Sequence, residues 1–271
     1  MFITPSFLII QLMFSGPVSG DTSTDGGFTT KLRQLKHDGA SVLVVGSLQP
    51  DHRRDICRRL FGDESSVDTL RRRIAVSTTG QAVWPTPGAD STPATFRHIT
   101  YDAPARGTTA HQSPPTADET DPDTPSTPPH PETATAPTAT TNSSTVAPAR
   151  VTVDSLADVG IAISSAIEFF DTDADGLEPA ELRVGIDSLL PLLEASDRET
   201  VFTFLHLITG RTTAADGMFH CHLPVEHDAT IVSVLSSLFD VVLEVQDRAD
   251  GYEERWSLTD EGRKSGWISR S

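Results

Sequence analysis

Lysine, cysteine and tyrosine are scarce in this 271-residue chain, which has three, two and two of them. Two cysteines, Cys57 and Cys221, cannot form a disulfide framework and are typical of a reducing compartment, so we expect a cytoplasmic protein. Basic residues are also few, with 21 Lys+Arg against 38 Asp+Glu and a net charge of −17. A general nucleic-acid binder needs a basic surface, and this composition argues against that class.

A long hydrophobic run is missing as well. The N-terminal apolar stretch, residues 2–14, is shorter than the about 20 residues that a membrane-spanning helix needs. A signal peptide begins with basic residues, and the first lysine or arginine here is Lys31. We therefore expect no membrane span and interpret residues 1–27 as a disordered or apolar extension. Translation from Met1 and translation from Met13 both fit this pattern.

The acidic residues have a marked bias, with 25 aspartates against 13 glutamates, while the basic residues are mostly arginine. A surface dense in carboxylates holds water and ions, and high salt screens the mutual repulsion of the charges. The composition therefore indicates a salt-rich cytosol and predicts a haloarchaeal source.

Residues 103–150 differ from the rest of the chain, because they contain ten of the 19 prolines and almost no aliphatic residues. Such a segment cannot bury enough apolar surface to offset its ordering entropy, and we expect a disordered linker. Alternating strand and helix patterns lie on both sides of this linker. We therefore interpret residues 28–102 and 151–260 as two parts of one domain, followed by a tail at 261–271.

Outside the linker, short apolar runs alternate with amphipathic segments. Strands are expected at 40–46, 71–78, 96–102, 182–189, 217–224, 240–247 and 253–260, and helices at 28–39, 49–63, 153–171, 197–212 and 228–239. In the connection before the third strand, Trp84 is the residue expected to dock on the core. This order predicts a three-layer α/β sandwich with a mainly parallel central sheet and an antiparallel edge at the C-terminus.

The stretch DTDADGLEPAEL at 171–182 resembles an EF-hand calcium loop. That loop needs a glutamate at its twelfth position and a helix after it. Here the twelfth residue is Leu182, Glu181 comes one position early, and a strand pattern follows. We therefore expect an acidic loop, with weak cation binding by its aspartates as the alternative.

A phosphate-binding loop of the Walker A type is absent. Gly46 follows the first strand pattern in the right place, but GSLQPDHR lacks the second glycine, the lysine and the Ser/Thr. Asp187 ends the apolar run LRVGID, where a Walker B aspartate would hold the Mg²⁺ hydration shell. An aspartate there is also a common helix cap. We expect no ATP hydrolysis and no cofactor.

Two groups of residues remain candidates for binding. Ligands of open α/β sheets bind at the carboxyl ends of strands, and an anion site or a salt-bridged surface could form there from Asp51, His52, Arg53, Arg54 and Asp187. The run HCHLPVEH places His220 and His222 on one strand face. Two imidazoles on one face can share a metal ion, or they can be ordinary polar residues of a strand.

The segments AELRVGIDSLLPLL and FLHLITGR, with DGMFHCHLP further on, resemble a haloarchaeal family of unknown function whose members are similar to degenerate RecA/KaiC-like P-loop ATPases. The resemblance covers residues 28–102 and 151–260. It implies a RecA-like sheet and a cytosolic protein, and it brings no activity and no catalytic residue.

These observations together predict a non-catalytic RecA-like pseudo-NTPase that acts as a regulatory or interaction module, with another protein as its partner and no nucleotide. A divergent nucleotide-binding protein that uses Gly46, Arg53, Arg54 and Asp187 is one alternative. A metal-dependent enzyme at His220 and His222 is the other.

Overall fold

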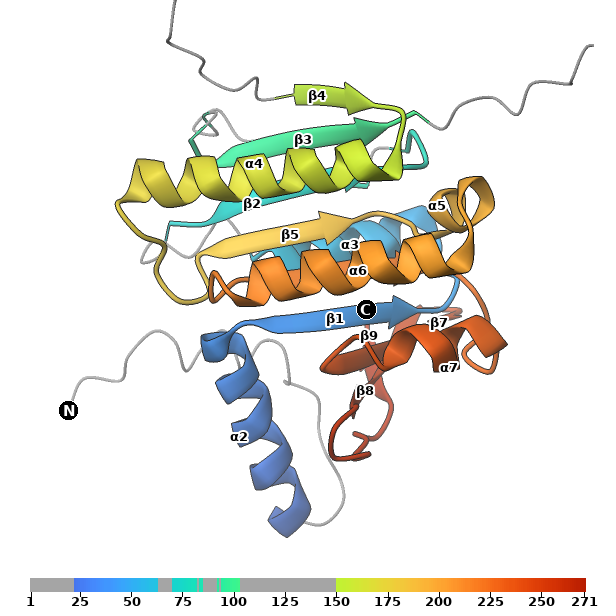
Figure 1. Ribbon diagram of the computed structural model, residues 1–271. Coiled ribbons are helices and arrows are strands. Elements are labelled where there is room, and N and C mark those ends of the chain that lie inside the picture. The colour runs from blue at the N-terminus through green and yellow to red at the C-terminus, as the bar shows by residue number, and fades with distance from the viewer. Residues whose placement is uncertain (1–21, 63–69, 82, 85–91, 93, 103–149) are drawn as a thin grey trace, which may run out of the picture. The chain divides into compact units, whose positions relative to one another are not determined.

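The computed structural model describes residues 22–62, 70–81, 83–84, 92, 94–102 and 150–271, which all belong to one compact unit (Figure 1). The predicted linker, except for its last residue, lies outside the described residues, as do both candidate start methionines. Among the described helices, none is long and apolar enough to cross a bilayer.

The described residues form one sheet of nine strands. The strands are β1 Ala40–Val45, β2 Arg72–Ser77, β3 Phe96–Tyr101, β4 Arg150–Val153, β5 Leu182–Ile186, β6 Met218–Leu223, β7 Val241–Arg248, β8 Gly251–Leu258 and β9 Ile268–Arg270. Their order is β4-β3-β2-β5-β6-β1-β7-β8-β9. The strands from β4 to β7 in this order are parallel, and β8 and β9 are added antiparallel. The predicted fold class, a mainly parallel sheet with an antiparallel C-terminal edge, is confirmed.

Helices cover both faces of the sheet. They are α2 Thr22–Asp38, α3 Pro50–Phe61, α4 Leu156–Ala174, α5 Leu190–Ala195, α6 Arg198–Thr213 and α7 Thr230–Ser236. Strand β1 shows why there are three layers: Leu43 packs in the core cluster shared with α4 and α6, while Val44 packs in the cluster shared with α3. Figure 1 shows α4 and α6 in front of the sheet and α3 behind it. A strand buried on both faces reads as a continuous apolar run, as β1 does.

Short-range capping fixes where the long helices begin. Ser155 accepts a hydrogen bond from the backbone N–H of Asp158 at the start of α4, and Asp197 accepts one from Thr200 at the start of α6. Each cap satisfies one of the donors that a helix N-terminus leaves unpaired. The predicted helices at 153–171 and 197–212 are confirmed within a few residues.

The structure adds three elements and lengthens a fourth. Helix α2 begins at Thr22 instead of residue 28, and α5 lies between the predicted strand and helix. Strand β4 follows the insertion, where the sequence suggested linker and then helix, and it pairs with β3. Strand β9 lies in the predicted tail and pairs with β8. These pieces are too short to carry a periodic pattern of their own.

The acidic stretch at 171–182 does not have the geometry of an EF-hand. Asp171 and Asp173 belong to the last turn of α4, and Asp173 pairs with Arg72 at 2.7 Å. Asp175 ends the helix in the left-handed conformation, with φ of 57°. Strand β5 follows where an EF-hand requires its exit helix. The rejection of an EF-hand is confirmed, although two of the aspartates are helical and not in a loop.

Candidate functional site

The carboxyl ends of β1, β5 and β6 lie side by side, because these strands are parallel neighbours. Val45 at the end of β1 is in register with Leu223 of β6, and Ile186 at the end of β5 is in register with Cys221. The sheet thus brings Gly46, Asp187 and His222 to one edge, as the strand pattern predicts for an open α/β sheet.

The turn after β1 is packed against its neighbours. Gly46 has φ of 127°, and a Cβ there would lie 2.1 Å from the carbonyl oxygen of Val245 in β7. The Gly46 N–H donates to the Leu223 carbonyl at 3.2 Å, and the Ser47 hydroxyl donates to the Pro224 carbonyl at 3.2 Å. Only glycine fits this position, and the reason is contact with β7.

The N-terminus of α3 is occupied by a carboxylate of the protein itself. The Gln49 N–H donates to Asp247 Oδ2 at 2.8 Å, and His52 Nδ1 lies 2.6 Å from Asp247 Oδ1. Pro50 takes the first helical position, where its missing N–H costs nothing. Helix N-termini attract anions, and at α3 that anion is Asp247. Sequence reasoning missed Asp247. Its only signal in the sequence was its place at the end of the apolar run 240–247, which forms β7 beside β1.

The two candidate arginines point to different surroundings. Arg54 is exposed and pairs with Asp51 at 2.6 Å, one helical turn earlier. Arg53 donates to the side-chain oxygen of Gln81, beyond the end of β2. Its charge also acts on Cys57 of the same helix, where it opposes the effect of burial on the thiol pKa. Arg53 therefore faces the strand ends, and Arg54 faces solvent.

Asp187 is completely buried, and both of its carboxylate oxygens accept hydrogen bonds. Its Oδ1 accepts from the backbone N–H and the hydroxyl of Thr78, both at 2.7 Å, and its Oδ2 accepts from the Thr79 hydroxyl at 2.9 Å. The Asp187 N–H donates to the Val76 carbonyl. These contacts join the end of β5 to the end of β2. The carboxylate as placed is a structural link between strands, and it is not a cap for a following helix.

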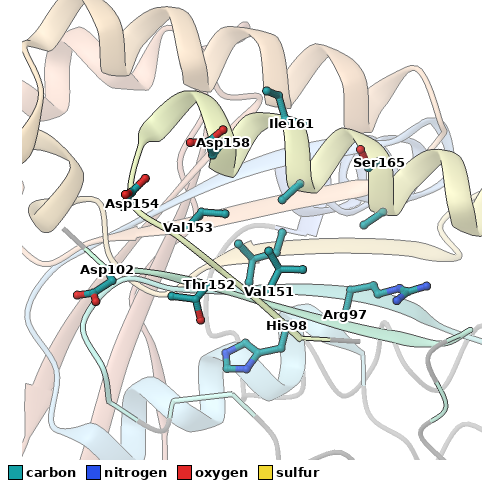
Figure 2. Close-up of a pocket in the computed structure, with 13 residues that line it drawn as sticks. Arg97, His98, Asp102, Val151, Thr152, Val153, Asp154, Asp158, Ile161 and Ser165 are labelled. Carbon is teal, nitrogen blue, oxygen red and sulfur yellow. The ribbon is translucent and has the colours of Figure 1, made fainter. Parts of the chain in front are cut away.

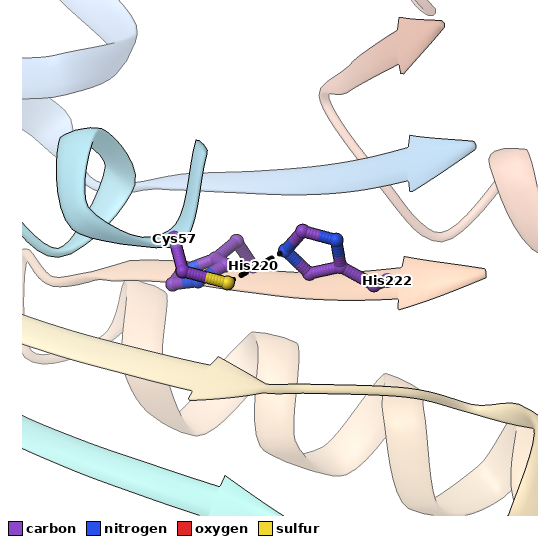
Figure 3. Close-up of side chains that lie close together, drawn as sticks. All are labelled: Cys57, His220 and His222. Atoms are coloured by element: carbon purple, nitrogen blue, oxygen red, sulfur yellow. Dashed lines mark hydrogen bonds between the residues drawn. The ribbon is translucent and has the colours of Figure 1, made fainter. Parts of the chain in front are cut away.

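Two histidines of β6 form a buried cluster with a cysteine of α3 (Figure 3). His220 and His222 are 2% and 4% exposed, and Cys57 is fully buried. The predicted common face of the two histidines is confirmed, with ring centroids 5.9 Å apart. Cys57 Sγ lies 3.3 Å from Nε2 of His222. Sequence reasoning missed Cys57, because nothing in a sequence links it to residues more than 160 positions away.

Aromatic rings pack around this cluster, and burial disfavours the charged forms of its members. The rings of Phe61 and Trp84 pack against each other in a tilted arrangement with centroids 4.7 Å apart, and both contact the ring of His220, so the predicted docking of Trp84 is confirmed. Burial, helped by the charge of Arg53, lowers the pKa of His222 to about 3. Burial likewise holds the pKa of His220 well below its usual range and raises that of the Cys57 thiol.

A hollow of about 670 Å³ lies at another edge of the sheet, between β3, β4 and α4 (Figure 2). Asp102, Asp154 and Asp158 line it together with Arg97 and His98. Two polar residues of its floor already have partners within the protein. The guanidinium carbon of Arg97 lies 4.1 Å from the centroid of the Phe169 ring, and His98 Nε2 is hydrogen-bonded to Ser77 Oγ at 2.8 Å. The predicted candidate residues do not line this hollow.

Comparison with known proteins gives one finding. A family model described as a family of unknown function (DUF7504) matches residues 39–245. The match begins just before β1 and ends within β7, so it spans the strand ends and the Cys57–His222 cluster. The comparison with curated proteins found no match.

Proposed function

The chain belongs to this family of unknown function, and we propose that it is a non-catalytic pseudo-NTPase with a RecA-like core, which acts as a cytoplasmic regulatory or interaction module. The family brings no activity with it. The proposal is therefore argued from the chemistry at the strand ends, where a nucleotide-binding relative would hold its phosphates.

The carboxylate of Asp247 at the N-terminus of α3 is the observation that carries the proposal. A phosphate-binding loop presents backbone N–H groups and a lysine to the phosphates. Here the Gln49 N–H is already bonded to Asp247, and the turn from Gly46 contains no lysine. A phosphate placed at this helix would meet a negative charge within a few ångströms, which is destabilising. The protein supplies its own anion in place of a ligand.

The strand order supports the RecA-like part of the proposal. In a RecA-type core, the strand before the phosphate loop and the strand with the Walker B aspartate are separated by one further strand. Strand β6 lies between β1 and β5 in the same way. Asp187 then has the Walker B position, and its oxygens bond threonine groups instead of facing a water-filled site.

Two exposed apolar side chains on the outer helices are compatible with a protein as the partner. Ile161 on α4 is 63% exposed and Leu207 on α6 is 62% exposed. Both lie near the crossing of the two helices, where Gly160 packs within 3.7 Å of the Phe204 ring. Single exposed apolar side chains are common on folded proteins, so this pair marks a face on which a partner can be sought and does not by itself define a docking surface.

Calorimetry tests the proposal directly. Wild type, Asp187→Asn and a control, Asp250→Asn, are titrated with ATP and GTP in molar KCl, with and without Mg²⁺. Asp250 is an exposed residue of the β7–β8 turn and matches the change in charge. We expect no binding heat from any of the three proteins. Magnesium-dependent nucleotide binding by wild type and the control that is lost in Asp187→Asn would refute the proposal and establish the nucleotide-binding alternative.

The same experiment gives a second readout. Asp187→Asn keeps one acceptor for Thr78 and loses the charge that Thr79 binds, so we expect a loss of about 1–3 kcal/mol in unfolding free energy. A stability loss without any change in ligand binding is the signature of a structural aspartate. Urea unfolding of the three proteins measures it.

A further inference from the structure

Cys57, His220 and His222 meet at one point between α3 and β6. Each offers one ligand atom, and these atoms all lie within 4.8 Å of one another. Figure 3 shows Cys57 reaching the strand from the helix, beside His220 and towards the ring of His222. All three residues are buried, so bulk water does not compete for them.

The cluster has an unused binding capacity. Nε2 of His220 is buried and has no hydrogen-bond partner among the described residues. A buried polar atom without a partner is costly, and native proteins rarely leave one unpaired. Cys57 and His222 contact each other, and their 3.3 Å sulfur–nitrogen contact uses a weak donor. A ligand that accepts lone pairs from all three side chains would remove this cost.

We propose that Cys57, His220 and His222 bind one thiophilic d¹⁰ cation, Zn²⁺ or Cu⁺. Metal–sulfur and metal–nitrogen bonds of about 2.3 and 2.0 Å place the donor atoms about 3.3–3.7 Å apart around such an ion. The Cys57–His222 separation of 3.3 Å is already close to this value, and no two of the three donor atoms lie more than 4.8 Å apart.

The donor set decides the class of ion. A thiolate and two imidazoles are soft and borderline ligands, whereas Mg²⁺ and Ca²⁺ require several oxygens. Asp187, whose charge also acts on Cys57, keeps its oxygens on threonine groups. On binding, the Cys57 S–H bond breaks, its proton passes to solvent, and the sulfur lone pair forms the metal bond.

A bound ion would tie α3 to β6 at the end of the sheet where the strand ends converge. The ion binds only the folded arrangement, because Cys57 is more than 160 residues from both histidines in the chain. Binding to the folded state alone raises stability as the metal concentration rises. The site therefore makes the position of α3 sensitive to metal supply.

Metal analysis and a cobalt spectrum test the inference. Protein purified without chelator is measured by mass spectrometry for zinc and copper, and the stripped protein is titrated with Co²⁺. We expect about one ion per chain and a thiolate-to-cobalt absorption band in the near ultraviolet. A parallel anaerobic titration with Cu⁺ against a chromogenic chelator decides between the two ions.

Cys57→Ala and His222→Gln are the test variants, and Cys221→Ala is the matched control. Cys221 is as buried as Cys57 and lies in β6 between the two histidines, but it packs in the core cluster on the opposite face of the sheet. We expect Cys57→Ala to abolish the band, His222→Gln to weaken affinity by about 100-fold or more, and Cys221→Ala to bind like wild type.

Thermal melts keep the test decisive if a variant is less stable. Added Zn²⁺ or Cu⁺ should raise the melting temperature of wild type and Cys221→Ala and leave that of Cys57→Ala unchanged. Absence of bound metal and of a cobalt band in wild type would overturn the inference, as would a band that survives in Cys57→Ala.

Discussion

Replacing Arg270 with alanine tests whether the last residues of the chain belong to the core. Arg270 lies in β9, and its Nε and Nη2 donate to Oε1 of Glu254 at 3.0 and 2.8 Å. Glu254 is fully buried in β8. Its other partners are Arg59 of α3, whose Nη2 donates to Oε2 at 2.5 Å, and the ring N–H of Trp256.

The expected loss of unfolding free energy follows from the partners that Glu254 keeps after the substitution. Removing one partner of a buried charge pair costs about 3–5 kcal/mol when the remaining charge is left uncompensated. Glu254 keeps Arg59, so we expect Arg270→Ala to lower the unfolding free energy by about 2–3 kcal/mol. Urea unfolding, followed by circular dichroism, measures this loss.

A matched control lies on β7, the strand on the other side of β8 from β9. Arg248 of β7 is 51% exposed and pairs with Glu253 at 2.7 Å. Water screens that pair, and Arg248→Ala should change stability much less. In a Glu254→Gln background the cost of Arg270→Ala should shrink, because the buried charge is gone. Equal losses for Arg248→Ala and Arg270→Ala would refute the reasoning, since β9 would then be peripheral.

Three further predictions concern the insertion, the acidic stretch and the turn after β1. Deleting residues 106–148, with a short flexible replacement between β3 and β4, should leave unfolding cooperative, since closure cost changes by only about 0.6 kcal/mol per doubling of loop length; loss of cooperativity would contradict it. Calorimetry should find no micromolar binding of calcium to the wild-type protein; such binding, if Asp171→Ala abolished it, would contradict the prediction. Gly46→Ala should cost about 2 kcal/mol or more in thermal or urea unfolding because its Cβ meets the Val245 carbonyl, whereas Gly80→Ala, also at positive φ but with open space around it, should cost less; equal costs would count against the contact.

The sequence alone predicts the strands that are buried on both faces. The run at 40–46 is continuously apolar, and β1 indeed packs on helices at both sides. The run at 182–189 likewise predicts β5 and places Asp187 at its end. Such strands carry their environment in their own composition, so a continuous apolar run of strand length is the signal that finds them. The exclusion of an EF-hand rests on the same local information.

The edge elements could not be predicted in this way. Strand β4 alternates between exposed and half-buried residues, and β9 has only three residues. A short strand is stable only when a neighbour supplies its backbone partners. Those neighbours are β3 and β8, and the sequence does not state which segments will lie beside them.

The candidate site divides in the same manner. The sequence determined that Gly46 follows a strand, that Asp187 ends one and that the two histidines share one face of a third, because apolar runs mark the strands. Only the tertiary structure decided what each of them touches. Asp187 meets Thr78 across 109 positions, His222 meets Cys57 across 165, and the N-terminus of α3 meets Asp247 across 198. Local patterns arise from neighbours along the chain, whereas these contacts arise from the pairing order of the sheet, which brings distant strand ends to one edge.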